Sequence, residues 1–187
     1  DINHDGQINE LDIVYLGSSN PKISGGFGFD FKYGRWTLKT NFNFRIGNKI
    51  VNMALMKAED MMYNRNQATS VNARWRKNGD RTDMPRALNS AAADGNVYNA
   101  LASDRYVSSG DYLRFQYLQL SYRVPEKFLK KYGLRQLNIS ASGNNLIFWS
   151  KYSGTDPDHS QSGYGPTIDD AQTPRSRSFT VSLNVGF

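Results

Sequence analysis

The residues from Ser178 to Phe187 constrain the fold most, because they alternate between apolar and polar side chains without an exception. Phe, Val, Leu, Val and Phe occupy the odd-numbered positions, and Ser, Thr, Ser, Asn and Gly occupy the even-numbered ones. A period of two places these two sets on opposite faces of a β-strand. The pattern therefore predicts a strand with one apolar and one polar face, as found in soluble sandwiches and in membrane barrels alike.

Four further segments show strand-like alternation. They span residues 27–33, 36–46, 112–124 and 135–148. The first two surround a turn at Gly34 and predict a hairpin whose apolar face is largely aromatic. In the third segment the alternation changes phase, which indicates a β-bulge near Gln116. We therefore expect an all-β chain of about five antiparallel strands, with one short helix within residues 53–66.

The connections between these segments alternate in length. The connections at residues 33–36 and 125–134 are short, whereas residues 47–110 and 149–175 form long ones. Outer-membrane barrels combine short periplasmic turns with long extracellular loops, and the smallest single-chain barrels have about eight strands. An aromatic residue after the final strand is also typical of these barrels. We therefore expect the C-terminal part of a larger transmembrane β-barrel, with the two long connections as extracellular loops.

The composition excludes several other classes of protein. The chain has no cysteine, which excludes thiol catalysis and cysteine-based zinc sites. It has no apolar run of the roughly 18 residues that a membrane helix needs. The net charge is +6, but Lys and Arg are scattered along the chain rather than gathered in one stripe, so we expect no nucleic-acid binding.

The first twelve residues have the spacing of a calcium-binding loop. Side-chain oxygens occupy positions one, three, five and twelve, and a glycine occupies position six. Calcium loops take their ligands from these positions and from the backbone carbonyl of position seven. We expect a structural Ca²⁺ held by Asp1, Asn3, Asp5, Asp12 and the carbonyl of Gln7. The alternative interpretation is an ordinary polar turn.

Aromatic residues in and beside the long connections are candidates for substrate binding. These candidates are Trp75, Tyr106, Trp149 and Tyr152. Flat aromatic faces beside hydroxyls and amides suit a sugar or a peptide, but large loops also need aromatic residues for their own cores. Both interpretations stay open from the sequence alone.

Catalytic patterns are weak in this sequence. Asp156, Asp158 and His159 surround Pro157, and acidic residues beside a proline are typical of turns. The sequence contains no nucleophile elbow, phosphate-binding loop or paired-histidine metal motif. We therefore expect that the chain is not an enzyme.

Six ordered segments resemble the C-terminal part of the SusC/RagA family of TonB-linked outer-membrane proteins of Bacteroidetes. They are DINHDGQINELD, LGSSNPKISGGFGFDFKYGRWTL, RWRKNGDRTDMPRA, SDRYVSSGDYLRFQYLQLSYRVP, SGNNLIFWSKYSGTDPD and RSFTVSLNVGF. The resemblance implies a plugged barrel of about 22 strands, of which this chain forms roughly the last quarter.

The resemblance also implies a function and partners. It implies an outer-membrane importer of glycans or peptides that works with a SusD-like lipoprotein, and with TonB through an N-terminal part that is not in this chain. The apolar strand faces would contact outer-membrane lipid, and polar residues such as Lys39, Asn41, Asn43 and Arg45 would line the lumen. The alternative is a secreted, calcium-stabilised β-domain that binds carbohydrate in solution.

Overall fold

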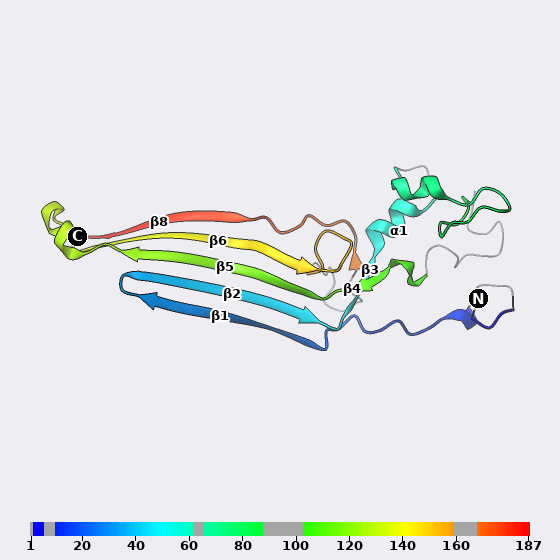
Figure 1. Ribbon diagram of the computed structural model, residues 1–187, viewed down its shortest axis with the longest axis horizontal. Coiled ribbons are helices and arrows are strands. Elements are labelled where there is room, and N and C mark those ends of the chain that lie inside the picture. Colours follow the sequence, from blue (N-terminus) through cyan, green and yellow to red (C-terminus); the bar gives the residue numbers. More distant parts are fainter. Residues whose placement is uncertain (1, 6–9, 62–65, 88–102, 159–167) are drawn as a thin grey trace. The chain divides into compact units, whose positions relative to one another are not determined.

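The computed structural model describes residues 2–5, 10–61, 66–87, 103–158 and 168–187 (Figure 1). These residues divide into two units. The sheet unit comprises residues 21–47, 110–151 and 173–187, and the loop unit comprises residues 1–20, 48–109 and 152–172. Among the described residues, no helix has the length and apolar character that a membrane span requires.

The sheet unit consists of one five-stranded antiparallel sheet, in which long strands lie side by side (Figure 1). Its strands are β1 (Ile23–Tyr33), β2 (Trp36–Ile46), β5 (Tyr112–Arg123), β6 (Gln136–Ser150) and β8 (Ser178–Gly186). Their spatial order is β1-β2-β5-β6-β8. Within the described part of the chain, β1 and β8 each keep one edge without a partner strand. The expected all-β fold with about five strands is confirmed, and the sheet is open.

The register carries the sequence alternation across the whole sheet. One row of paired residues is apolar and consists of Trp36, Tyr122, Ile139 and Leu183. The next row is polar and consists of Thr37, Ser121, Ser140 and Ser182. On the last strand the apolar side chains are exposed, with 76% exposure at Phe179 and at Val181. The sheet therefore has one polar face and one apolar face that no other described element covers.

A bulge explains the change of phase in β5. On the β2 side, Phe42 pairs with Phe115 and Asn41 pairs with Tyr117, so that Gln116 has no residue directly opposite it. On the β6 side, Phe115 pairs with Ile147 and Tyr117 pairs with Asn144, so that two residues of β6 lie opposite Gln116. Across from it, Asn145 adopts a left-handed backbone conformation with a φ of 56°. Because Gln116 is an extra residue, the polar side chains of β5 lie on the polar face both before and after the bulge. The bulge expected near Gln116 is confirmed.

Both short connections of the sheet contain a glycine in the left-handed region. The turn between β1 and β2 has Gly34 at a φ of 58°, and the connection between β5 and β6 contains Gly133 at a φ of 68°. This second connection contains the short helix α2 (Glu126–Leu129) and the 3₁₀ turn η4 (Lys130–Tyr132). The alternation pattern did not indicate α2.

The loop unit contains a small sheet and short helical segments. Strands β4 (Val107–Ser109), β3 (Lys49–Asn52) and β7 (Ile168–Asp169) form the sheet in that order, with β3 antiparallel to β4 and parallel to β7. The 3₁₀ turns are η1 (Glu10–Asp12), η2 (Thr69–Ala73) and η3 (Asp104–Tyr106). The core of the unit contains Ile50, Val71, Met84, Tyr106 and Tyr152.

The helix expected within residues 53–66 is α1, Met53–Glu59. The Asn52 side chain accepts a hydrogen bond from the Leu55 N–H at 2.8 Å, which is the normal capping interaction at a helix N-terminus. The helix ends at Asp60, where the backbone becomes extended. Residues 62–65 of the expected stretch lie outside the described residues.

Candidate binding site

An ion pair in the loop unit joins three segments that are distant in sequence. Glu59, at the end of α1, has a side chain that is 3% exposed, and its Oε2 accepts a hydrogen bond from Arg105 Nε at 2.9 Å. Ser70 Oγ donates to Glu59 Oε1 at 2.7 Å. Arg105 Nη1 also donates to the Asp83 carbonyl oxygen at 3.2 Å. Glu59 lies in α1, Ser70 in η2 and Arg105 in η3. The network therefore holds these three segments together, and the bond to the Asp83 carbonyl attaches a fourth.

The surroundings of Glu59 favour its charged form. Burial by itself raises the pKa of Glu59, but the hydrogen bonds from Arg105 and Ser70 and the positive charge of Arg105 outweigh burial. The pKa of Glu59 therefore lies below the ordinary glutamate value. The hydrogen bond to Glu59 in turn raises the pKa of Arg105. The pair is ionised at neutral pH.

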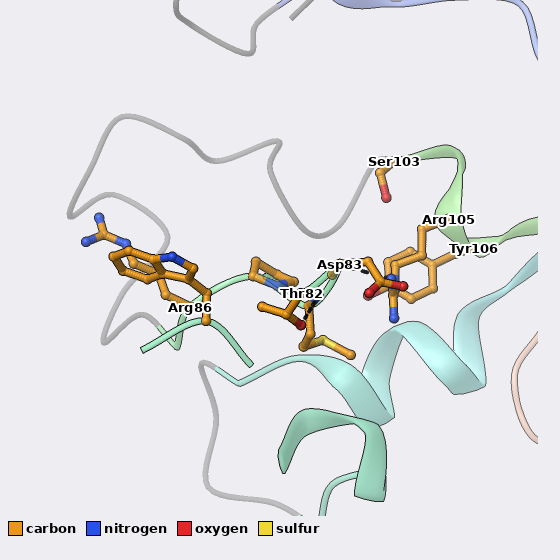
Figure 2. A pocket seen from close by; sticks show the side chains of 9 residues that line it. Thr82, Asp83, Arg86, Ser103, Arg105 and Tyr106 are labelled. Carbon is orange, nitrogen blue, oxygen red and sulfur yellow. Dashed lines mark hydrogen bonds between the residues drawn. The ribbon is translucent and has the colours of Figure 1, made fainter. Parts of the chain in front are cut away.

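A cavity of about 500 Å³ lies beside this network (Figure 2). Its lining comes from Trp75, residues 82–86, Ser103, Arg105 and Tyr106. Figure 2 shows Arg105 and Tyr106 at one end of the cavity and Arg86 at the other. A volume of this size is within the usual range of small-molecule sites.

Local hydrogen bonds hold the chain around the cavity. The Trp75 N–H donates to the Met84 carbonyl at 3.0 Å. The Thr82 hydroxyl donates to the Ala73 carbonyl at 2.6 Å and accepts from the Met84 N–H at 3.1 Å. These bonds close residues 73–84 into a folded loop. The arrangement presents one indole, one phenol, hydroxyls and two guanidinium groups to the same space.

The four aromatic candidates from the sequence lie in three different places. Trp75 and Tyr106 line the same cavity, although Tyr106 is only 3% exposed and also belongs to the core. Trp149 lies in β6 of the sheet unit, paired with Leu113 on the apolar face and 50% exposed. Strand β6 therefore extends two residues beyond the expected end at residue 148. The structure brings Trp75 and Tyr106 together and places Trp149 and Tyr152 elsewhere.

Tyr152 is part of a buried polar contact in the loop unit. Its hydroxyl donates to Asp169 Oδ2 at 2.7 Å. Burial and this hydrogen bond to a carboxylate raise the pKa of Tyr152. A Cβ on the neighbouring Gly154 would lie 2.3 Å from the Tyr152 ring, so the backbone approaches the ring closely there. This geometry is that of a structural side chain.

The calcium-loop residues are described in part, because Asp1 and Gln7 lie outside the described residues. The Ile2 N–H donates to Asp12 Oδ1 at 2.6 Å, which brings the two ends of the twelve-residue segment together. Asn3 Nδ2 donates to Asp5 Oδ2 at 3.0 Å, and the Asp5 N–H donates to Asn3 Oδ1 at 3.1 Å. Asn3 and Asp5 thus contact each other, and Asp12 contacts the backbone of Ile2. In the described ranges, no group of three or more His, Cys, Asp or Glu side chains has metal-site geometry.

The acidic residues around Pro157 form a turn. Asp156 is buried at 2% exposure, and its Oδ1 accepts a hydrogen bond from the Asp158 N–H at 3.0 Å. His159 lies outside the described residues. This local bond is the turn chemistry expected from the sequence.

The sequence did not single out Asp83, Arg86, Ser103 and Arg105 as site residues. The only signal available was the segment RWRKNGDRTDMPRA, which carries part of the family resemblance. The position of Arg105 depends on its ion pair with Glu59, which is 46 residues away in the sequence.

Comparison with known proteins gives a consistent group of relatives, although no family model matches the chain. Two TonB-dependent receptors of Formosa agariphila, P3 and P26, are 30% and 28% identical to it over its whole length. The chain spans 18% and 19% of these relatives. Two solved structures of the RagAB peptide importer share its fold. The closed-closed state has a TM-score of 0.74 and 20% sequence identity, and the match covers 92% of this chain and 18% of that chain. The open-open state has a TM-score of 0.67 and 19% sequence identity, and the match covers 90% of this chain and 17% of that chain.

Proposed function

Because the chain belongs to the TonB-dependent receptors of the SusC/RagA type, we propose that it forms part of an outer-membrane nutrient importer. The sheet unit supplies a section of the barrel wall. The parts of the loop unit at residues 48–109 and 152–172 belong to the extracellular loops. The activity is transport rather than catalysis.

The observation that carries this proposal is the pair of opposite faces on the sheet. Leu183 is 66% exposed and Phe29 is 63% exposed on the apolar face. In water such a continuous exposed apolar surface would cause aggregation, whereas in lipid the same surface is stable. The polar face carries Lys39, Asn41 and Asn43 on β2 and is suited to a water-filled lumen.

The proposed partners follow from the family. A SusD-like lipoprotein cooperates with the receptor, and TonB acts through a part of the receptor outside this chain. The matched solved structures are of a peptide importer. The substrate class proposed here is glycans or peptides.

The calcium loop is proposed to have a structural role. Asn3 and Asp5 contact each other and Asp12 accepts a hydrogen bond from the Ile2 N–H, and Asp1 and the Gln7 carbonyl would complete the ligand set. A bound Ca²⁺ would offset repulsion between the carboxylates and fix the loop. Extracellular calcium would keep even a site with a Kd of about 10⁻³ to 10⁻⁴ M filled.

Two measurements on the full-length receptor test the importer proposal. We expect the receptor to stay with the outer-membrane fraction and to be released only by detergent. We also expect cells that lack the gene to lose uptake of a labelled glycan or peptide that the parent strain imports. Release of a monodisperse protein into plain buffer would instead favour the secreted, calcium-stabilised carbohydrate-binding domain.

A further inference from the structure

We propose that the loop unit binds carboxylate-bearing ligands in two cavities that share Thr82 and together carry an excess of positive charge. This inference rests on the proposed importer function and gives its substrate a chemical class. The first cavity is the one lined by Trp75, Arg86 and Arg105. The second has a volume of about 530 Å³ and is lined by residues 72–74, 76–77 and 80–82. We call the pair the basic double cavity.

The charge of the basic double cavity is strongly unbalanced. Its basic lining residues are Arg74, Arg76, Lys77, Arg81, Arg86 and Arg105. Its acidic lining residues are Asp80 and Asp83. Glu59 compensates one of the six basic groups through its ion pair with Arg105. In the first cavity Arg86 and Arg105 are balanced by Asp83 and Glu59. The excess of positive charge lies in the second cavity, and it attracts an anion to the pair.

The acidic lining residue of the second cavity is already engaged with the backbone. Asp80 Oδ2 accepts hydrogen bonds from the Arg76 N–H at 2.9 Å and from the Lys77 N–H at 3.1 Å. This contact shapes the loop that presents the basic side chains. Asp80 therefore acts mainly as a turn-forming group.

Some of the guanidinium groups are held in place by the protein. Arg76 Nη2 donates to the Asn72 carbonyl at 3.1 Å, which holds one nitrogen of this guanidinium. Arg105 is held at all three nitrogens by Glu59 and the Asp83 carbonyl. A guanidinium with one edge fixed can offer the other edge to a carboxylate, and the planar fork of arginine matches a carboxylate in a bidentate contact. Fixing the donor beforehand also reduces the entropy lost on binding.

The cavity lining also contains flat and hydroxylated groups beside the charges. Trp75 offers an aromatic face, and Thr82, Ser103 and Tyr106 offer hydroxyls. An acidic oligosaccharide and an acidic peptide both combine carboxylates with hydrogen-bonding groups. The shared chemistry is the carboxylate, and a neutral oligosaccharide of equal length lacks it.

The test uses full-length receptor in detergent and isothermal titration with three probes: tetragalacturonate, tetraglutamate and maltotetraose. The variant Arg81→Gln with Arg86→Gln removes one charge from each cavity. The matched control is Lys130→Gln with Lys131→Gln, which removes the same charge from exposed positions in η4 of the sheet unit. Heat-modifiable migration on a gel verifies that each variant has a folded barrel.

We expect at least one anionic probe to bind more tightly than maltotetraose and to weaken as salt rises. The cavity variant should weaken that binding roughly tenfold, because charge-assisted contacts contribute more than neutral ones. The control variant should change it by less than about twofold. Preference for tetragalacturonate would identify an acidic glycan, and preference for tetraglutamate would identify an acidic peptide.

Two results would overturn the inference. One is equal binding of maltotetraose and both anions. The other is equal loss of anion binding in the cavity and control variants, which would show that only overall charge matters. Uptake measured separately distinguishes the two proposals. If uptake depends on the receptor but no anion binds, only the proposal of the basic double cavity is refuted. If an anion binds but uptake does not depend on the receptor, only the importer function is refuted.

Discussion

Replacing Leu183 with Arg should destabilise the barrel, because Leu183 lies on the exposed apolar face of β8. Leu183 precedes Phe187 by four residues. At about 3.4 Å per residue and a strand tilt of about 40°, this spacing corresponds to about 10 Å along the membrane normal. The apolar band of such barrels is about 25 Å tall. If Phe187 marks one interface, Leu183 is therefore close to the middle of the bilayer.

The chain offers a matched control one residue away. Ser182 pairs with Ser140 on the polar face, at nearly the same depth as Leu183 but on the opposite side of the sheet. An Arg near the bilayer midplane costs about 2 to 4 kcal/mol on a lipid face. At Ser182 the Arg would be solvated by the lumen, and we expect a cost below about 1 kcal/mol.

The comparison requires full-length receptor in lipid vesicles and unfolding by guanidinium, followed by tryptophan fluorescence. We expect the Leu183→Arg midpoint to fall clearly below that of the parent protein and the Ser182→Arg midpoint to stay near it. Equal loss at both positions would indicate a strand buried on both faces. No loss at Leu183 would show that this face does not contact lipid, and would refute the assignment.

Three further predictions concern other parts of the chain. Glu59→Gln should weaken the contact with Arg105 and lower the thermal stability of the loop unit in the full-length receptor, by roughly 1 to 3 kcal/mol. The pKa of Glu59 is below the ordinary value of 4.5. The stabilising contribution of Glu59 is therefore complete above pH 4.5 and is lost as the pH falls through the folded-state pKa. Proteolysis of the loops at decreasing pH measures this loss of stability, which the Glu59→Gln variant should not show. Calcium titration by calorimetry should give heat with the parent receptor and less heat after Asp5→Ala with Asp12→Ala, whereas identical heats would leave a polar turn. Deletion of Gln116 should shift one part of β5 to the wrong faces and prevent membrane assembly, as measured by heat-modifiable migration; normal assembly would contradict the role of the bulge.

The strands of the sheet unit could be predicted because their signal is local. Each strand repeats its apolar residues at every second position, and a one-residue slip would exchange the two faces. The phase change at Gln116 was visible for the same reason. The end of β6 was predicted too early. The sequence suggests a loop after Phe148, whereas in the structure Phe148 and Trp149 continue the strand on opposite faces. Here pairing with β5 extends the strand beyond its clear alternation.

The loop unit was much harder to predict because its structure depends on distant contacts. Strand β3 pairs with β7, which is more than 110 residues further along the chain, and β7 has only two residues. No periodic pattern can be recognised in so short a strand. The Glu59–Arg105 ion pair likewise joins two ordinary charged positions. Trp75 was identified from its residue type alone, whereas the charged lining of its cavity required the folded loop.

The sheet unit reverses the usual distribution of charged and apolar side chains, which explains why composition alone is a poor guide to this chain. Arg114 is 1% exposed on the polar face, and its guanidinium lies 5.6 Å from the Tyr112 ring centre and 5.5 Å from that of Phe148. On the opposite face Val181 is 76% exposed. The mean hydropathy of −0.63 therefore does not describe a water-soluble surface around an apolar core. It includes strands whose polar residues pack with one another and with aromatic rings, while the apolar residues are exposed on the face that we propose contacts lipid.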